Sequence, residues 1–134
     1  MMRSIFVAAA MALAGAAQAA QPGEILAGYE AAARRETPAF SGASSSRGEQ
    51  FFNARHGNDW SCASCHGASG AAQGKHAKTG KAIAPLSPTA NPERFADTAK
   101  VEKWFKRNCS DVLGRACTSA EKGDVLAFLL KGGK

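Results

Sequence analysis

Two cysteines three positions apart, followed directly by a histidine, are the residues of this chain whose types and spacing best suit chemistry. They form the run Cys62-Ala63-Ser64-Cys65-His66. Thiols at this spacing lie on one side of a helical turn, where both can reach the vinyl groups of one porphyrin, and the histidine then comes under the iron. The motif predicts one haem c, bound covalently through Cys62 and Cys65, with His66 as the proximal iron ligand.

Two other uses of such a cysteine pair have less support in the sequence. A thioredoxin-like redox pair would be surrounded by alternating strands and helices, and that pattern is missing. A zinc site would need a second close pair, but seven residues separate Cys109 from Cys117. If His66 binds iron, its other ring nitrogen needs a hydrogen-bond acceptor. A carbonyl near Pro85 is the candidate, although Pro85 is equally compatible with an ordinary loop proline.

The group on the opposite side of the iron is an open question. Small cytochromes of this kind commonly use a methionine sulfur, but all 3 methionines lie among the first eleven residues. The remaining candidates are His56, His76, a lysine, water or a weak oxygen donor. Both histidines lie in polar surroundings, and solvent-exposed side chains are therefore expected for them.

Asn108 is one such oxygen donor, and it occupies an unexpected position. In a helix over residues 98–109 it follows Trp104 by four residues and Val101 by seven, so it lies on the apolar stripe. A buried amide without a partner costs about 1–3 kcal/mol, so a backbone group, a water or a metal has to satisfy it. An asparagine that caps the end of the helix would have the same spacing, and the residues alone leave both interpretations open.

The amino terminus has the layout of an export signal. Arg3 is followed by an apolar run over residues 5–17 and by small residues around a cleavage point after Ala19. This run is too short to span a membrane, which takes about 20 apolar residues, and no later stretch is apolar enough. We expect a cleaved signal peptide at residues 1–19, a soluble cytochrome c domain at residues 20–134, and a periplasmic location, where exported cysteines tend to form disulfides.

The charge of the chain favours a protein partner over nucleic acid. The sequence has 17 basic and 11 acidic side chains, a net charge of +6, and loss of Arg3 with the signal peptide leaves +5. No five basic residues are consecutive, so nucleic-acid binding is not expected. A lysine-bearing surface that meets an acidic redox partner fits this moderate excess better.

Hydrophobic periodicity predicts an all-α fold, with a few helices packed around one haem and no strand pattern of any length. Asp97 is the expected N-cap of one helix, and Thr118 to Glu121 have the pattern of a capping box. The expected elements are helices over residues 22–36, 47–55 and 98–109, a short turn or helix over 61–66, a long loop over 67–92, and a last helix from Thr118 onward.

Several stretches match one known family over nearly the whole mature chain. They are Ala27 to Ala33, the haem motif through Gly67, Thr79 to Lys81, Ile83 to Leu86, Val101 to Trp104, Arg107 to Cys109, and Gly114 to Cys117. The chain thereby resembles the SHP-type, oxygen-binding high-spin class I cytochromes c. The most specific element is Asn108 followed by Cys109, because ordinary class I cytochromes have no reason to carry this pair.

The resemblance implies a small class I cytochrome c fold and several functional properties. It implies that the Asn108 side chain is the sixth ligand of ferric iron, and that a Cys109–Cys117 disulfide lies beside it. It further implies that Asn108 leaves the iron on reduction, after which dioxygen, nitric oxide or carbon monoxide can bind. The partner of such proteins is a dihaem cytochrome c that supplies electrons.

Three functions are compatible with these residues. The first is redox-gated binding of a small gaseous ligand. The second is plain electron transfer by a permanently six-coordinate haem, in which His56 or His76 competes for iron and Lys100, Lys103, Lys106 and Arg107 form a docking face. The third is an enzyme that slowly converts nitric oxide or oxygen. No acid–base residue is placed convincingly near Asn108, so the sequence does not separate a binder from a slow catalyst.

Overall fold

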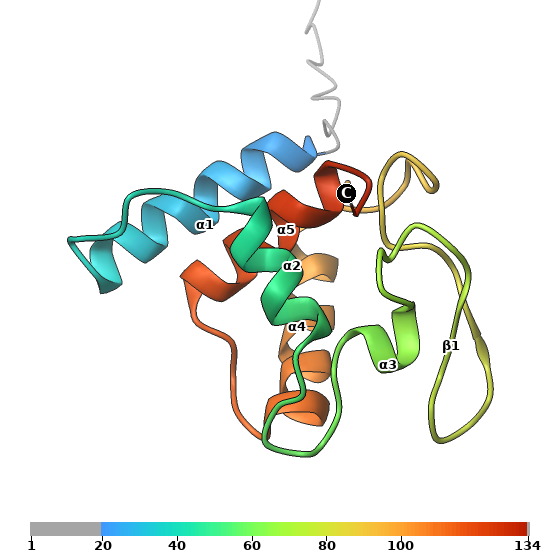
Figure 1. Ribbon diagram of the computed structural model, residues 1–134. Coiled ribbons are helices and arrows are strands. Elements are labelled where there is room, and N and C mark those ends of the chain that lie inside the picture. The colour runs from blue at the N-terminus through green and yellow to red at the C-terminus, as the bar shows by residue number, and fades with distance from the viewer. Residues whose placement is uncertain (1–19, 134) are drawn as a thin grey trace, which may run out of the picture.

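The computed structural model describes residues 20–133, and within them the chain is a helical domain with one minimal sheet (Figure 1). This confirms the predicted all-α class. The predicted signal peptide, residues 1–19, lies outside the described residues. Within residues 20–133, no helix has the length and apolar character needed to cross a membrane. The elements are α1 Pro22–Glu36, α2 Ser45–Asn53, α3 Ala63–His66, β1 Gly74–Lys75, β2 Ala82–Ile83, α4 Thr98–Leu113 and α5 Ser119–Leu130.

Helix α5 is the most buried helix of the described chain, and it packs against both α1 and α2. The predicted buried side of α5 is confirmed, since Val125, Leu126, Phe128 and Leu129 are all buried. Leu126 joins Ile25 and Tyr29 of α1 in one core cluster, whereas the other three join Phe52 of α2 in a second. The core is therefore arranged around α5.

The crossing of α2 over α5 depends on a glycine. A Cβ atom at Gly48 would come within 1.9 Å of the Asp124 carbonyl oxygen, so the two helix backbones touch at this point. The buried Asp124 carboxylate fixes the same crossing, because it accepts hydrogen bonds from the backbone N–H of Ser44 and from the Arg47 guanidinium, both at 2.6–2.8 Å. Helix α2 begins at Ser45, two residues before the predicted start, because Ser44 is its N-cap.

Helix α4 is longer than its sequence predicts. The Asp97 side chain caps its start by accepting a hydrogen bond from the backbone N–H of Lys100, as predicted. The helix continues past residue 109 to Leu113 and ends at Gly114, whose backbone is left-handed with φ 73°. Val101 is buried, but Trp104 is 42% exposed, so the expected apolar stripe is only partly covered by protein.

The predicted loop over residues 67–92 is present, with one addition. Strands β1 and β2 form a two-residue antiparallel ladder in which Gly74 pairs with Ile83. So short a ladder has no alternation of apolar and polar residues, and the sequence therefore gives no sign of it. The hairpin lies against α3 (Figure 1).

Candidate functional site

Helix α3 carries the predicted haem motif on a single turn. Cys62 is its N-cap residue, and Cys65 and His66 lie within it. Both thiols are free, because the other two cysteines of the chain pair with each other. Burial raises the pKa of Cys62 to about 11, so this thiol stays protonated at neutral pH. Catalytic redox cysteines have lowered pKa values, and the environment of Cys62 therefore argues against a thioredoxin-like pair.

The environment of His66 suits a metal ligand. The side chain is half-buried, and its ring centroid lies 6.4 Å from that of Phe52 in the core. Burial lowers the pKa of His66 to about 4, and the positive charge of Arg94 and a smaller electrostatic contribution from His76 lower it further. The imidazole is thus neutral at physiological pH, which is the state that can donate a lone pair to iron. Two free thiols and a neutral imidazole on one turn are the donor set that a covalently bound haem requires.

The carbonyl near Pro85, the expected partner of His66, is engaged elsewhere. The Pro85 oxygen accepts hydrogen bonds from Arg94 Nε at 2.9 Å and from Asn91 Nδ2 at 3.4 Å. Arg94 Nη2 also donates to the Ala84 oxygen at 2.9 Å. Arg94 thus holds this part of the loop and adds a positive charge near His66. This role of Arg94 is not predictable from the sequence, because a single arginine in a polar loop has no periodic or motif signal.

The two histidines that could compete for iron are both half-buried rather than exposed. His56 Nε2 lies 2.8 Å from the Phe51 carbonyl oxygen, and the His56 ring packs on the Phe51 ring with centroids 4.5 Å apart. His76 Nδ1 accepts a hydrogen bond from the backbone N–H of Thr79 at 3.2 Å. Each histidine therefore has one ring nitrogen in a local contact, His56 with the last turn of α2 and His76 within its own loop.

Asn108 lies inside α4, five residues before the end of the helix, so the alternative that it caps the helix is wrong. The residue is half-buried, and its amide keeps some exposure to solvent, since no fully buried side-chain polar atom within residues 20–133 lacks a hydrogen-bond partner. The neighbouring Phe105 packs against both core clusters, and Cys62 packs against the second of them. Helix α4 and the haem motif therefore border the same apolar cluster, although the structure gives no direct contact between Asn108 and His66.

The predicted disulfide between Cys109 and Cys117 is present, with Cα atoms 5.6 Å apart. It joins the last turns of α4 to the segment that precedes α5. Arg115, inside the closed loop, forms two hydrogen bonds of 2.7 and 2.9 Å to the Glu121 carboxylate. The residue after Asn108 is therefore tied covalently to the start of α5, which restricts where Asn108 can lie.

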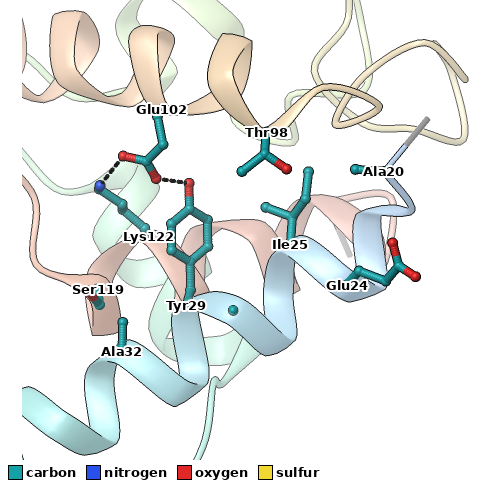
Figure 2. A pocket seen from close by; sticks show the side chains of 10 residues that line it. Ala20, Glu24, Ile25, Tyr29, Ala32, Thr98, Glu102, Ser119 and Lys122 are labelled. Atoms are coloured by element: carbon teal, nitrogen blue, oxygen red, sulfur yellow. Dashed lines mark hydrogen bonds and ion pairs between the residues drawn. The ribbon is translucent and has the colours of Figure 1, made fainter. Parts of the chain in front are cut away.

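A separate groove of about 400 Å³ lies between α1, α4 and α5, away from the cysteines (Figure 2). Its polar centre is the Glu102 carboxylate, which accepts hydrogen bonds from Tyr29 at 2.5 Å and from Lys122 at 2.8 Å. Figure 2 shows these three side chains converging from three helices. Tyr29 and Lys122 thus each bind one oxygen of the Glu102 carboxylate. These contacts join three helices, so we interpret the groove as a structural junction.

Comparison with known proteins gives consistent matches. Residues 38–129 match a family described as a domain of unknown function, DUF1924. The cytochrome c-type protein SHP of Cereibacter sphaeroides (strain ATCC 17023) is 42% identical over 132 residues, which cover 96% of this chain and 98% of that protein. Cytochrome c'' of Methylophilus methylotrophus is 40% identical over 106 residues, covering 76% of this chain and 74% of that protein.

Solved structures of the same two proteins have the same fold. The structure of oxidised SHP, described as an oxygen-binding cytochrome c, superposes with a TM-score of 0.71 at 45% identity, over 81% of this chain and 95% of that one. The crystal structure of oxidised cytochrome c'' from Methylophilus methylotrophus superposes with a TM-score of 0.74 at 36% identity, over 81% of this chain and 92% of that one.

Proposed function

Because the chain belongs to the SHP-type class I cytochromes c and carries one covalently bound haem c, we propose that it binds a small diatomic ligand, dioxygen or nitric oxide, only in its reduced state. Asn108 is the sixth ligand of the ferric iron and leaves it on reduction. The observation that carries this proposal is the position of Asn108, which is half-buried inside α4 rather than at a helix end, directly before the disulfide-bonded Cys109.

The residues of α3 hold the cofactor in this proposal. Cys62 and Cys65 form the two thioether links, and His66 is the proximal ligand. When bound, the haem would supply an iron that can change between the ferric and ferrous states. The lowered pKa of His66, which burial and the charge of Arg94 mainly produce, keeps its imidazole available for iron in both states.

The chemistry of an amide explains why Asn108 would act as a redox-sensitive ligand. An amide oxygen is a hard, weak donor, so it suits the ferric ion better than the ferrous ion. Its hold therefore loosens when an electron arrives. Once released, the Asn108 N–H₂ group can donate a hydrogen bond to an incoming ligand. Phe105, packed against both core clusters, limits the access of bulk water from the side of the core.

The substitution Asn108→Ala tests the proposal. We expect the variant to retain its covalent haem, to show an altered ferric optical spectrum, and to bind cyanide faster in the ferric state, because the internal ligand is gone. Ser110→Ala, an exposed position of the same helix, is the matched control and should leave the spectrum unchanged. An Asn108→Ala protein with the ferric spectrum of the parent would show that another group, such as His56 or His76, occupies the iron.

A cytochrome of this kind exchanges electrons with a partner protein, and we propose a dihaem cytochrome c as that partner. Lys100, Lys103, Lys106 and Arg107 are all exposed on α4, the helix that carries Asn108. A basic surface on the helix that holds the sixth ligand would direct an acidic partner to the haem. This basic face is equally compatible with the alternative function, plain electron transfer. The two functions differ in one observation, because only a redox-gated ligand-binding protein should bind a gas in its reduced state.

We also propose that the protein is exported to the periplasm after cleavage behind Ala19. The apolar run over residues 5–17 and the small residues around Ala19 support this boundary. The mass of the purified holoprotein is expected to equal that of residues 20–134 plus one haem. A mass that includes residues 1–19 would contradict processing at this point.

A further inference from the structure

The carboxyl end of α4 is capped by a loop that is distant in sequence. The last four carbonyls of an α-helix have no partner inside the helix. In α4, Asn58 Nδ2 donates to the Ser110 oxygen at 3.3 Å and to the Asp111 oxygen at 3.0 Å. The backbone N–H of Asn58 donates to the Val112 oxygen at 3.2 Å. Asn58 thus donates to three successive carbonyls at this end of the helix, of which Ser110 also accepts the backbone N–H of Gly114 at 3.1 Å.

The local backbone brings Asn58 against the helix end. A Cβ atom at Gly57 would lie 2.7 Å from the Leu113 oxygen, so only glycine allows this approach. Asp59 has φ 59°, a left-handed conformation that aspartate tolerates better than most residues. The turn is closed by the His56 N–H, which donates to the Trp60 oxygen at 2.9 Å. Figure 1 shows this connection between α2 and α3 passing at the lower end of α4.

The Asn58 contact lies close in sequence to both proposed iron ligands, His66 and Asn108. The loop that contains Asn58 leads directly into Cys62 and the α3 turn with His66. The carbonyls that Asn58 binds begin two residues after Asn108, on the following turn of the same helix. Among the described contacts of the α4 carboxyl end, the Asn58 hydrogen bonds tie it to the haem-motif side, whereas the Cys109–Cys117 disulfide ties it to α5.

We propose that Asn58 is a positioning residue, which fixes the end of α4 relative to the haem-binding turn and thereby holds Asn108 at the distance at which it can bind ferric iron. The inference rests on the proposed role of Asn108. A weak donor such as an amide binds iron only when its position is already fixed, because the coordination bond itself cannot offset the entropy of ordering a mobile helix end.

The test is a double-mutant cycle that measures the affinity of the ferric holoprotein for cyanide, which competes with Asn108 for the iron. Loss of the Asn58 amide should weaken this internal competitor. We expect Asn58→Ala to raise the cyanide affinity by at least about threefold, the factor that corresponds to part of one hydrogen bond. In an Asn108→Ala background, Asn58→Ala should have no further effect, because the competitor that it positions is already absent.

Two further variants separate positioning from a general loosening of the fold. Asn58→Asp keeps the size of the side chain but loses both amide donors, so it should behave like Asn58→Ala. Asn53→Ala is the matched control, because Asn53 Nδ2 also donates to two backbone oxygens, those of Glu49 at 3.0 Å and Ala68 at 3.2 Å, but does not touch α4. Its cyanide affinity should equal that of the parent protein.

The possible outcomes are distinguishable. A rise with Asn58→Ala that disappears in the Asn108→Ala background supports the positioning role. An equal rise in both backgrounds, or no rise at all, overturns it and leaves the Asn108 assignment intact. If Asn108→Ala alone changes neither the ferric spectrum nor the cyanide affinity, the proposed function fails, and the role of Asn58 fails with it.

Discussion

Among single residues outside the haem motif, Glu102 is a partly buried carboxylate that binds two other helices through hydrogen bonds. Burial alone would raise the pKa of its carboxyl group, but hydrogen bonds from Lys122 and Tyr29 outweigh burial and lower it. Burial, reinforced by the hydrogen bond to Glu102, raises the pKa of Tyr29 well above its ordinary value, so Tyr29 remains a donor. Folding therefore favours the ionised form of Glu102 and joins α1, α4 and α5 through one carboxylate.

This environment predicts a pH dependence of stability. A carboxyl group whose pKa is lowered on folding contributes stability above its unfolded pKa, here 4.5, and the contribution is lost as the pH falls through the folded value. We expect the free energy of unfolding to decrease as the pH drops below 4.5, and Glu102→Gln to make this decrease smaller. Urea titrations on both sides of that pH measure it, with exposed Glu49→Gln as the control. If the free energy of unfolding fell equally with pH in Glu102→Gln and in Glu49→Gln, Glu102 would not be the source of the pH dependence.

At the scale of elements, the features that were predictable from sequence are those decided within one turn of chain. The caps at Asp97 and Thr118 depend on side chains that bond three residues ahead, and both are present as predicted. The structure extends α4 beyond the predicted end at residue 109 to the left-handed Gly114, and its last turn also contacts Asn58, more than fifty residues earlier, a contact for which the sequence has no local signal. The contacts of Arg94 and Asn91 with the Pro85 oxygen are likewise not predictable, since loop-to-loop contacts have no periodic signal.

The junction of α4 and α5 gives a prediction about stability. The Cys109–Cys117 disulfide closes a short loop, which restricts the unfolded chain. Replacement of both cysteines by serine is expected to lower the free energy of unfolding by about 2–3 kcal/mol. Urea denaturation of the holoprotein measures the change, and the haem should stay attached, because it is linked through Cys62 and Cys65. A variant as stable as the parent would show that Arg115 and Glu121 suffice to hold this junction.

For the whole molecule, we expect its charge to influence how it meets a redox partner. The net charge of +6 includes four exposed basic side chains on α4. If these direct an acidic partner, the rate of reduction by that partner should fall steeply as ionic strength rises. Stopped-flow reduction of the parent protein at increasing salt tests this, with a Lys103→Gln, Lys106→Gln variant expected to show a weaker dependence. A rate that is insensitive to salt would assign the docking surface elsewhere.

The contact between α2 and α5 at Gly48 also limits how this sequence can change over time. With the Asp124 carbonyl at 1.9 Å from any added Cβ, substitution by even the smallest side chain requires two helix backbones to separate. In a library in which every codon is randomised, selection for a folded protein would return a single letter at position 48 and a broad mixture at exposed Glu49 beside it. The gene therefore stores more information in the residue with no side chain than in its charged neighbour.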